Sequence, residues 1–477
     1  MKNFYVSLVF IFFLLLTGCS YQGNLNTFDT LYYNQNEQKA FEFSKKMAQN
    51  NLLWKIQSGV SGYMAGKYKE SMSILDAAEN LINKNQAQGF FSSSLSNVGA
   101  TLFNDNIKSY QGNLYEGVLI NYYKALNALM MDDDLRARVE FNRANDRQRR
   151  AKDYYQKEIQ KALKNQEEKY KKDPKAKQVD QNVSSDKIDN ILNSQYSNLK
   201  RFAIYDGFIN PAISYISGLY FSLQGDFKGI DLLKEAYGIN RSKLIAEDMI
   251  LFEKKQYMKK KYTWIVIEDG KSPTKKEFSI NLPLYLISDQ VLYFGLALPQ
   301  LEEGSSFYDS FDMIDTKGSK NFEEISLIDG VIANEFSKQL PYIITRAIIS
   351  AVYKASMQSV LKQILGGYGA MGGALFSATT TAADTRITTV FPHKIWLNRV
   401  QNNEEKITIK ANQKEILEIK LINCNANKAS FDDPTQNPIL KNKEKKEYTV
   451  CKNTNNLLYI RTTKNNIIPK LIIGEKK

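Results

Sequence analysis

The chain has 477 residues, with 64 Lys and Arg against 51 Asp and Glu, a formal net charge of +13 and one histidine, His393. A single histidine excludes any metal site built on two histidines, and it leaves His393 as the sole base available to a Ser-His-Asp triad. The length suffices for two or more domains, and the basic balance suits anionic partners.

The first eighteen residues are typical of a secretory signal peptide. Lys2 precedes the apolar run of residues 4–16, which is too short to remain as a membrane-spanning helix. The sequence Leu-Thr-Gly-Cys at residues 16–19 resembles a bacterial lipobox, which implies cleavage before Cys19 and lipidation of its thiol. An uncleaved anchor or a chance match to the lipobox is the alternative. Ser20, by the sorting rule of enteric lipoproteins, favours the outer membrane. We therefore expect an envelope lipoprotein that faces the periplasm and meets no nucleic acid.

Residues 19–30 are predicted to form a flexible tether, and residues 31–260 a helical domain. In this domain, apolar residues recur at three- and four-residue spacing. Three segments share the spacing of a tetratricopeptide helix pair: a small residue (Gly59, Ala125 or Gly218) lies seven positions before the first residue of a turn. The small residue lets two helices approach, and the turn ends one helix and caps the next. Unrelated helical hairpins remain the alternative.

A charged stretch at residues 157–200 separates the second of these segments from the third. It is rich in Lys, Gln, Asn and Asp, and Pro174 would break a single helix through it. Residues 164–189 contain few apolar side chains, which predicts a solvated or disordered insertion.

Residues 261–385 are predicted to mix strands with one long helix. Alternating patterns indicate strands at 262–268, 276–282 and 291–298. Residues 327–362 follow with a helical pattern that includes Pro341, which should kink the helix or open a second one. Residues 364–383 carry no charge, and we expect an apolar hairpin against the core or a partner. Residues 367–372 match G-x-G-x-x-G, but no strand precedes them, so we expect no dinucleotide site and no cofactor.

Residues 386–477 are predicted to form a small β domain, similar to a sandwich. The alternating segments are residues 390–400, 406–410, 416–423, 447–452, 457–462 and 469–473. The fold class expected for the whole chain is multidomain α+β, with tetratricopeptide-like helical repeats, a mixed middle region and this β domain.

Cys424 and Cys451 form an even pair once Cys19 is assigned to lipid. An exported protein meets an oxidising compartment, so we predict a disulfide between them, with two free thiols as the alternative. Closing a loop of this length would contribute roughly 3–4 kcal/mol in the chain-entropy description.

Arginines are concentrated between residues 136 and 150. At 100° per residue, Arg136, Arg143, Arg147 and Arg150 fall on one face of a helix, beside its apolar stripe. Guanidinium groups bind carboxylates and phosphates in a bidentate manner, so this face is a candidate partner-binding site. The alternative is pairing within the chain, for example with Glu140.

No catalytic constellation is evident. The adjacent glutamates at 302–303, 323–324 and 404–405 point apart on a helix or strand, so they cannot act as a paired acid and base. The three aspartates at 132–134 are typical of a turn and helix cap rather than a metal site. His393 has no nucleophile near it in sequence. We therefore expect a structural histidine, no metal and no enzymatic activity.

Several of these segments resemble a family of uncharacterised tetratricopeptide-like lipoproteins of Gram-negative bacteria. The resemblance rests on residues 122–126 (YYKAL), 138–144 (RVEFNRA), 147–150 (RQRR), 210–218, 298–299 and 383–386. It implies the helical fold and the envelope location but no reaction. The chain departs from the family by the insertion at 157–200 and a longer C-terminal domain.

The sequence therefore predicts a lipid-anchored periplasmic adaptor that binds other envelope proteins. The alternatives are an envelope enzyme acting on peptidoglycan or glycan, and a structural subunit of a large envelope machine. A deep polar pocket within residues 262–400 would favour the enzyme, whereas an open helical groove lined by Arg143 and Arg147 would favour the adaptor.

Overall fold

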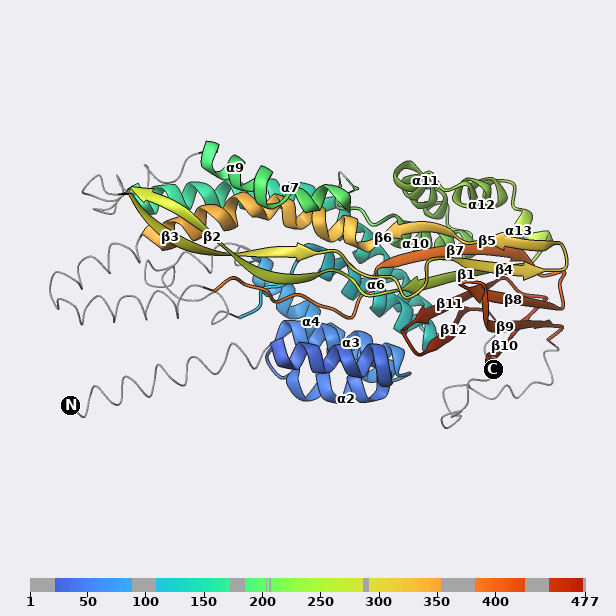
Figure 1. Cartoon of the computed structure of the whole chain (residues 1–477). Helices are drawn as coiled ribbons and strands as arrows, with labels where there is room; N and C mark the ends of the chain where they lie inside the picture. The colour runs from blue at the N-terminus through green and yellow to red at the C-terminus, as the bar shows by residue number, and fades with distance from the viewer. Residues whose placement is uncertain are drawn as a thin grey trace.

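The computed structural model of the chain describes residues 22–87, 109–171, 185–202, 204–205, 207–285, 291–352, 382–424 and 446–474. The protein is a mixed α+β structure with helices in the N-terminal part and strands paired into sheets in the C-terminal part (Figure 1). In the view of Figure 1 the sheets lie at the right, and a long helix pair and a β-hairpin extend to the left.

The helices pack mainly as sequential neighbours, α2 on α3, α3 on α4, α6 on α7 and α10 on α11. The bounds are η1 Thr30–Gln35, α2 Glu37–Met47, α3 Leu52–Met64, α4 Tyr68–Ala87, α6 Leu114–Met130, α7 Asp134–Lys171, α9 Ser185–Gln195, η4 Ser197–Arg201, α10 Pro211–Leu223, α11 Lys228–Asn240, α12 Lys243–Glu253 and α13 Gln256–Lys259. Asparagine side chains accept backbone hydrogen bonds at the starts of α2, α3 and α10, which explains where these helices begin.

The turns within the three predicted helix pairs share one geometry. The first turn residue, Gly66, Asp132 or Gly225, has a positive φ of 73°, 57° or 73°. In each turn the N–H of the following residue donates to the carbonyl five positions earlier, at distances of 2.9 Å. This is the hydrogen bond of a Schellman helix end, so the same local device reverses the chain three times.

The expected flexible tether is wrong for the described residues. Residues 22–29 are helical, and Leu25 and Phe28 are buried. Phe28 lies against Trp54, and Asp29 pairs with Lys271 of the sheet region. The segment is ordered because its two apolar side chains, three residues apart, face the same side of the helix and enter the core.

The predicted insertion at residues 157–200 is also largely helical. Helix α7 continues to Lys171, and α9 covers Ser185–Gln195. Ala162 is buried in a small cluster with Tyr155 and Tyr342, and Ile191 is buried in the main core. Lys, Glu and Gln have high intrinsic helix propensity, so a few buried apolar side chains are enough to hold these segments as packed helices. Pro174 lies outside the described residues.

Within the described residues the strands form two five-stranded sheets and a two-stranded hairpin, with orders β12-β11-β1-β7-β6, β10-β9-β8-β4-β5 and β2-β3. The strands are β1 Tyr262–Asp269, β2 Thr274–Tyr285, β3 Val291–Glu302, β4 Phe311–Asp315, β5 Gly318–Asn321, β6 Glu323–Leu327, β7 Lys394–Gln401, β8 Lys406–Ala411, β9 Lys414–Ile422, β10 Lys446–Cys451, β11 Asn456–Thr462 and β12 Ile467–Ile473. All nine predicted strands are present, whereas β4, β5 and β6 were not predicted.

The sheets cross the boundary that the sequence analysis placed between residues 385 and 386. Strand β1 lies between β7, which is antiparallel to it, and β11, which is parallel. Side chains of both five-stranded sheets, such as Ile265, Leu458, Ile409 and Ile419, share one buried cluster. The predicted separate C-terminal domain is therefore wrong, because β1 supplies the centre of a sheet whose other strands come mostly from the C-terminal segment.

The helix that follows β6 is continuous from residue 328 to residue 352 in the described part, and Pro341 lies within it. Its buried face includes Ile344 and Ile348, as the wide apolar face predicted. Tyr342 of this helix shares a buried cluster with Tyr155 and Ala162 of α7, so the two helices lie side by side. Residues 364–381, including the glycines of 367–372, lie outside the described residues.

Candidate functional site

A cavity of about 480 Å³ opens between α4 and α7, the second helices of the first two pairs. Its lining comprises Glu79, Asn80, Asn83, Gln86, Leu114, Arg143, Asp146, Arg147, Arg150, Ala151 and Tyr154. Three of the four predicted arginines, Arg143, Arg147 and Arg150, therefore lie at one cavity. Within the described structure, the predicted binding face of α7 therefore lines this cavity.

A buried lysine organises the charges beneath the cavity. Lys124 of α6 is almost completely buried, and its Nζ lies 2.9 Å from Asp76 and 2.8 Å from Glu140 and also pairs with Glu79. Burial raises the pKa of Glu79, but hydrogen bonds from Lys124, Asn121 and Arg147 outweigh it and lower that pKa to about 2. The carboxylate of Glu79 therefore stays ionised at neutral pH.

The same three carboxylates, Asp76, Glu79 and Glu140, have oxygens within 4.8 Å of one another, which is close enough to hold a metal ion. The ammonium group of Lys124 contacts all three. A cation already occupies the centre of this cluster as part of the protein, so the cluster is an ion-pair network and not a metal site.

Arg147 forms a wall of the cavity. Its Nε donates to Asn121 Oδ1 at 2.7 Å, and its Nη2 donates to Glu79 at 3.1 Å and to Asn83 at 2.7 Å. A Cβ on Gly117 of α6 would lie 3.3 Å from Arg147 Nη1. Gly117 thus leaves room for the arginine to cross α6. These partners cannot be read from local sequence patterns, because α4 and α6 contact α7 only in the folded chain.

Arg143 and Arg150 are the open cations of the site. Arg143 is 51% exposed, and among the described residues it donates one hydrogen bond, to Glu140 at 3.1 Å, while a Glu79 oxygen lies 3.7 Å from it. Arg150 is 81% exposed, and its nearest carboxylate oxygen, on Asp146, is 3.8 Å away. These two side chains therefore keep most of their donors for other groups. The alternative of internal pairing with Glu140 therefore holds for Arg143, and partner binding by this face stays a prediction.

Arg136 is separate from the cavity. Its Nη2 lies 2.5 Å from Asp76, and it is absent from the cavity lining. Its place near the start of α7 explains this, since it lies two helical turns before Arg143. We assign it to the ion-pair network around Asp76.

His393 is buried, and its Nδ1 lies 2.8 Å from Oδ1 of Asp329. The other carboxylate oxygen of Asp329 accepts from the N–H of Gly304 at 2.6 Å. This hydrogen bond ties the loop before β7 to the start of the 328–352 helix. The acidic residues near it also have structural partners: Glu323 accepts from the N–H of Leu244, and Glu324 pairs with Lys394.

Among the fully buried glutamates that the sequence patterns did not reveal, Glu268 and Glu335 each join several elements. Glu268 of β1 accepts hydrogen bonds from the hydroxyls of Tyr122, Tyr123 and Tyr459, at 3.0, 2.8 and 2.6 Å. It joins α6 to the sheet. Burial raises the pKa of this carboxyl, an effect that the charge of Arg461 opposes.

Glu335 of the 328–352 helix accepts from the N–H groups of Leu114 and Tyr115 at the start of α6, at 2.8 and 3.0 Å. The hydroxyl of Tyr155 on α7 donates to the same carboxylate at 2.5 Å. Burial raises the pKa of Glu335 to about 7, although these hydrogen bonds lower it. One side chain thus links three helices beneath the cavity.

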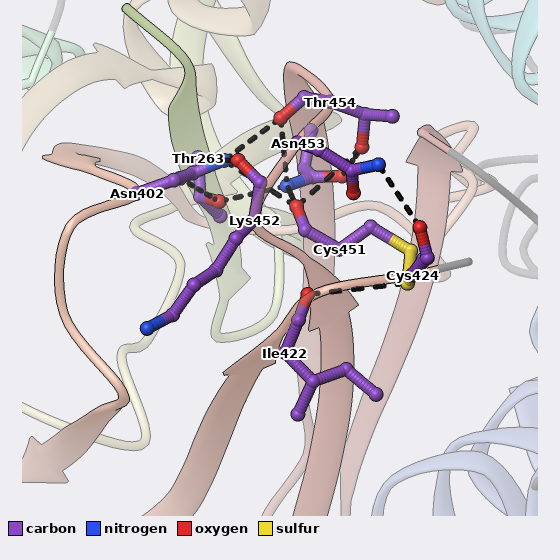
Figure 2. Close-up of a disulfide and its surroundings, with 9 residues drawn as sticks. Thr263, Asn402, Ile422, Cys424, Cys451, Lys452, Asn453 and Thr454 are labelled. Carbon is purple, nitrogen blue, oxygen red and sulfur yellow. Dashed lines mark hydrogen bonds between the residues drawn. A yellow bond between two sulfur atoms is a disulfide. The ribbon is translucent and has the colours of Figure 1, made fainter.

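The predicted pair Cys424–Cys451 is joined as a disulfide, with the Cα atoms 5.4 Å apart (Figure 2). The side chain of Asn453 donates to the Cys424 carbonyl at 3.1 Å, and Asn402 donates to the Thr454 carbonyl at 2.7 Å. The disulfide joins the end of β9 to β10 and closes the segment between them.

Cys19 and the predicted signal peptide lie outside the described residues. Among the described helices, none combines the length and the apolar character that crossing a bilayer requires.

Compared with known protein families, curated proteins and solved structures, the chain matches none of them.

Proposed function

We propose that this protein is a lipid-anchored scaffold or adaptor of the cell envelope, which binds other envelope proteins through its helical part. The observation that supports it most is the cavity between α4 and α7, where Arg143 and Arg150 present exposed guanidinium groups beside about 480 Å³ of open volume. Exposed guanidinium groups can pair with carboxylates of a partner in a bidentate manner, which favours recognition.

We further propose that the three helix pairs are tetratricopeptide-like repeats. Two observations support this relationship. The turns share a positive φ and the same hydrogen bond, and the small residue seven positions earlier lies at the helix contact in the first and third pairs. A Cβ on Gly218 would lie 2.9 Å from the Gly229 carbonyl oxygen. The shared core of the two five-stranded sheets likewise supports a sandwich-like β part.

The membrane anchor is proposed from the lipobox-like sequence at residues 16–19. Replacing Cys19 with Ser should move the protein from the membrane fraction to the soluble fraction and should abolish metabolic labelling with a fatty acid. The Cys424→Ser variant is the matched control, and it should remain lipidated. A Cys19→Ser protein that still carries label and still sediments with membranes would contradict the anchor.

The adaptor function is tested by cross-linking in intact cells. We expect the full-length protein to form cross-links with one or more envelope proteins, and the double variant Arg143→Gln/Arg150→Gln to lose them. Lys152→Gln, an exposed residue of α7 outside the cavity lining, controls for loss of charge. Equal circular dichroism and equal melting temperatures must accompany the result. Retention of every cross-link in the double variant would exclude this cavity as the docking site.

A further inference from the structure

The cavity combines unused guanidinium donors with side-chain amides. An arginine offers five N–H donors. Arg143 uses one of them in a hydrogen bond to Glu140, and Arg150 makes no hydrogen bond within the described part of the chain. The opposite wall carries Asn80, Asn83 and Gln86 of α4. The oxygens of Asn83 and Gln86 accept from Arg147, which leaves their NH₂ groups available.

We propose that this cavity binds an extended acidic peptide segment of a protein partner, with one carboxylate on Arg143 and another on Arg150. The inference rests on the proposed adaptor function and specifies the chemistry of the partner. The amide groups of α4 would pair with the peptide backbone between the two carboxylates, because an extended strand presents its own N–H and C=O groups at regular intervals.

The spacing of the two arginines selects the spacing of the ligand. Seven residues along α7 place the Cα atoms of Arg143 and Arg150 about 10 Å apart. In an extended peptide, side chains two positions apart lie on the same face at about 7 Å. The long, exposed arginine side chains cover the remaining difference. Acidic residues at positions i and i+2 therefore fit, whereas adjacent acidic residues point to opposite faces.

The charge of the site favours carboxylates over phosphate. Glu79 and Asp146 also line the cavity. The cavity and the ion-pair network beneath it together carry a net charge of only +1. The cations are Lys124, Arg136, Arg143, Arg147 and Arg150, and the carboxylates are Asp76, Glu79, Glu140 and Asp146. A doubly charged phosphate would meet the two lining carboxylates at short range. A singly charged carboxylate meets less repulsion and matches the planar guanidinium in a bidentate pair.

The test uses full-length protein in detergent micelles and a fluorescently labelled peptide of glycine and serine with glutamates at positions i and i+2. Fluorescence anisotropy at low ionic strength should show saturable binding. Arg143→Gln or Arg150→Gln should weaken it by about tenfold each. Lys152→Gln should leave it unchanged. A peptide with adjacent glutamates should bind several-fold more weakly, and one with glutamines in their place should not bind.

Three outcomes would overturn the proposal: equal binding of the glutamine peptide, wild-type affinity in both arginine variants, or displacement of the peptide by inorganic phosphate at the same concentration as unlabelled peptide. The last would assign the cavity to phosphate ligands. Failure here is distinguishable from failure of the adaptor function. If cross-links to envelope proteins are lost in Arg143→Gln/Arg150→Gln while no acidic peptide binds, the adaptor function stands and the acidic ligand is wrong.

Discussion

Gly59 of α3 and Leu75 of α4 touch so closely that a Cβ on Gly59 would lie 2.3 Å from Cδ2 of Leu75. No real Cβ contact is this short, so the absence of a side chain at residue 59 sets the distance between the two helices. The spacing pattern in the sequence predicted this role for Gly59.

The first prediction concerns this contact. Gly59→Ala should lower the free energy of unfolding by about 1–3 kcal/mol, because overpacking outweighs the better helix propensity of alanine. Gly238→Ala in α11 is the matched control, since a Cβ there meets nothing within 4 Å. The control should be neutral or more stable by up to about 1 kcal/mol. Urea denaturation measures both, and a Gly59→Ala protein as stable as the Gly238→Ala protein would contradict the close contact.

The second prediction concerns the buried lysine. Lys124→Met should lower the free energy of unfolding by about 3–5 kcal/mol, because it leaves Asp76, Glu79 and Glu140 facing one another without their shared cation. Lys45→Met removes a half-exposed pair with Glu70 and should cost less than about 1 kcal/mol. Equal losses in the two variants, measured by urea denaturation at pH 7, would show that the network contributes nothing beyond surface pairing.

The third prediction concerns pH. The pKa of Glu335 is about 7 in the folded protein against 4.5 as its ordinary value, so the folded state holds this proton more tightly. The resulting stabilisation is complete below pH 4.5 and is lost as the pH rises through 7. The wild type should therefore lose a few kcal/mol of stability between pH 5 and pH 8 that Glu335→Gln does not lose. Parallel pH profiles of the two proteins would refute the shift.

The fourth prediction concerns the disulfide. Thiol titration of the unfolded wild type should detect two more reactive thiols after reduction than before it. In the Cys424→Ser/Cys451→Ser variant, reduction should add no reactive thiol. That variant should unfold with a free energy about 3–4 kcal/mol lower, because the open chain gains entropy in the unfolded state. An unchanged thiol count on reduction would exclude the bond.

The sequence predicted most helices and strands, but it did not predict which of them pack or pair with one another. The strands β1 and β7–β12 follow from alternation, which is a local property. In contrast, β5, Gly318–Asn321, is exposed along its whole length and carries no such alternation. The helical start at Leu25 and Phe28 was missed because two apolar side chains between polar ones are typical of a linker, and the contact of Phe28 with Trp54 exists only in the folded chain.

The candidate site was predicted in part for the same reason. The angular spacing on one helix brought Arg143, Arg147 and Arg150 together correctly. It could not show that Asn83 and Glu79, more than sixty residues earlier, hold Arg147. Nor could it show that Arg136 is used by Asp76. Such contacts depend on how α4 and α6 pack against α7, which no local pattern contains.

Strand β1 is buried along its whole length, and one of its edges pairs with β11. Strand β11 follows β1 by almost two hundred residues, so the ribosome makes it much later. A chain that emerges from its N-terminus holds this apolar strand with an open edge until the last residues arrive. Such an edge is a template for pairing with other chains. Slow folding is expected from the large sequence separation between β1 and β11, because the chain must close a long loop before the two strands pair.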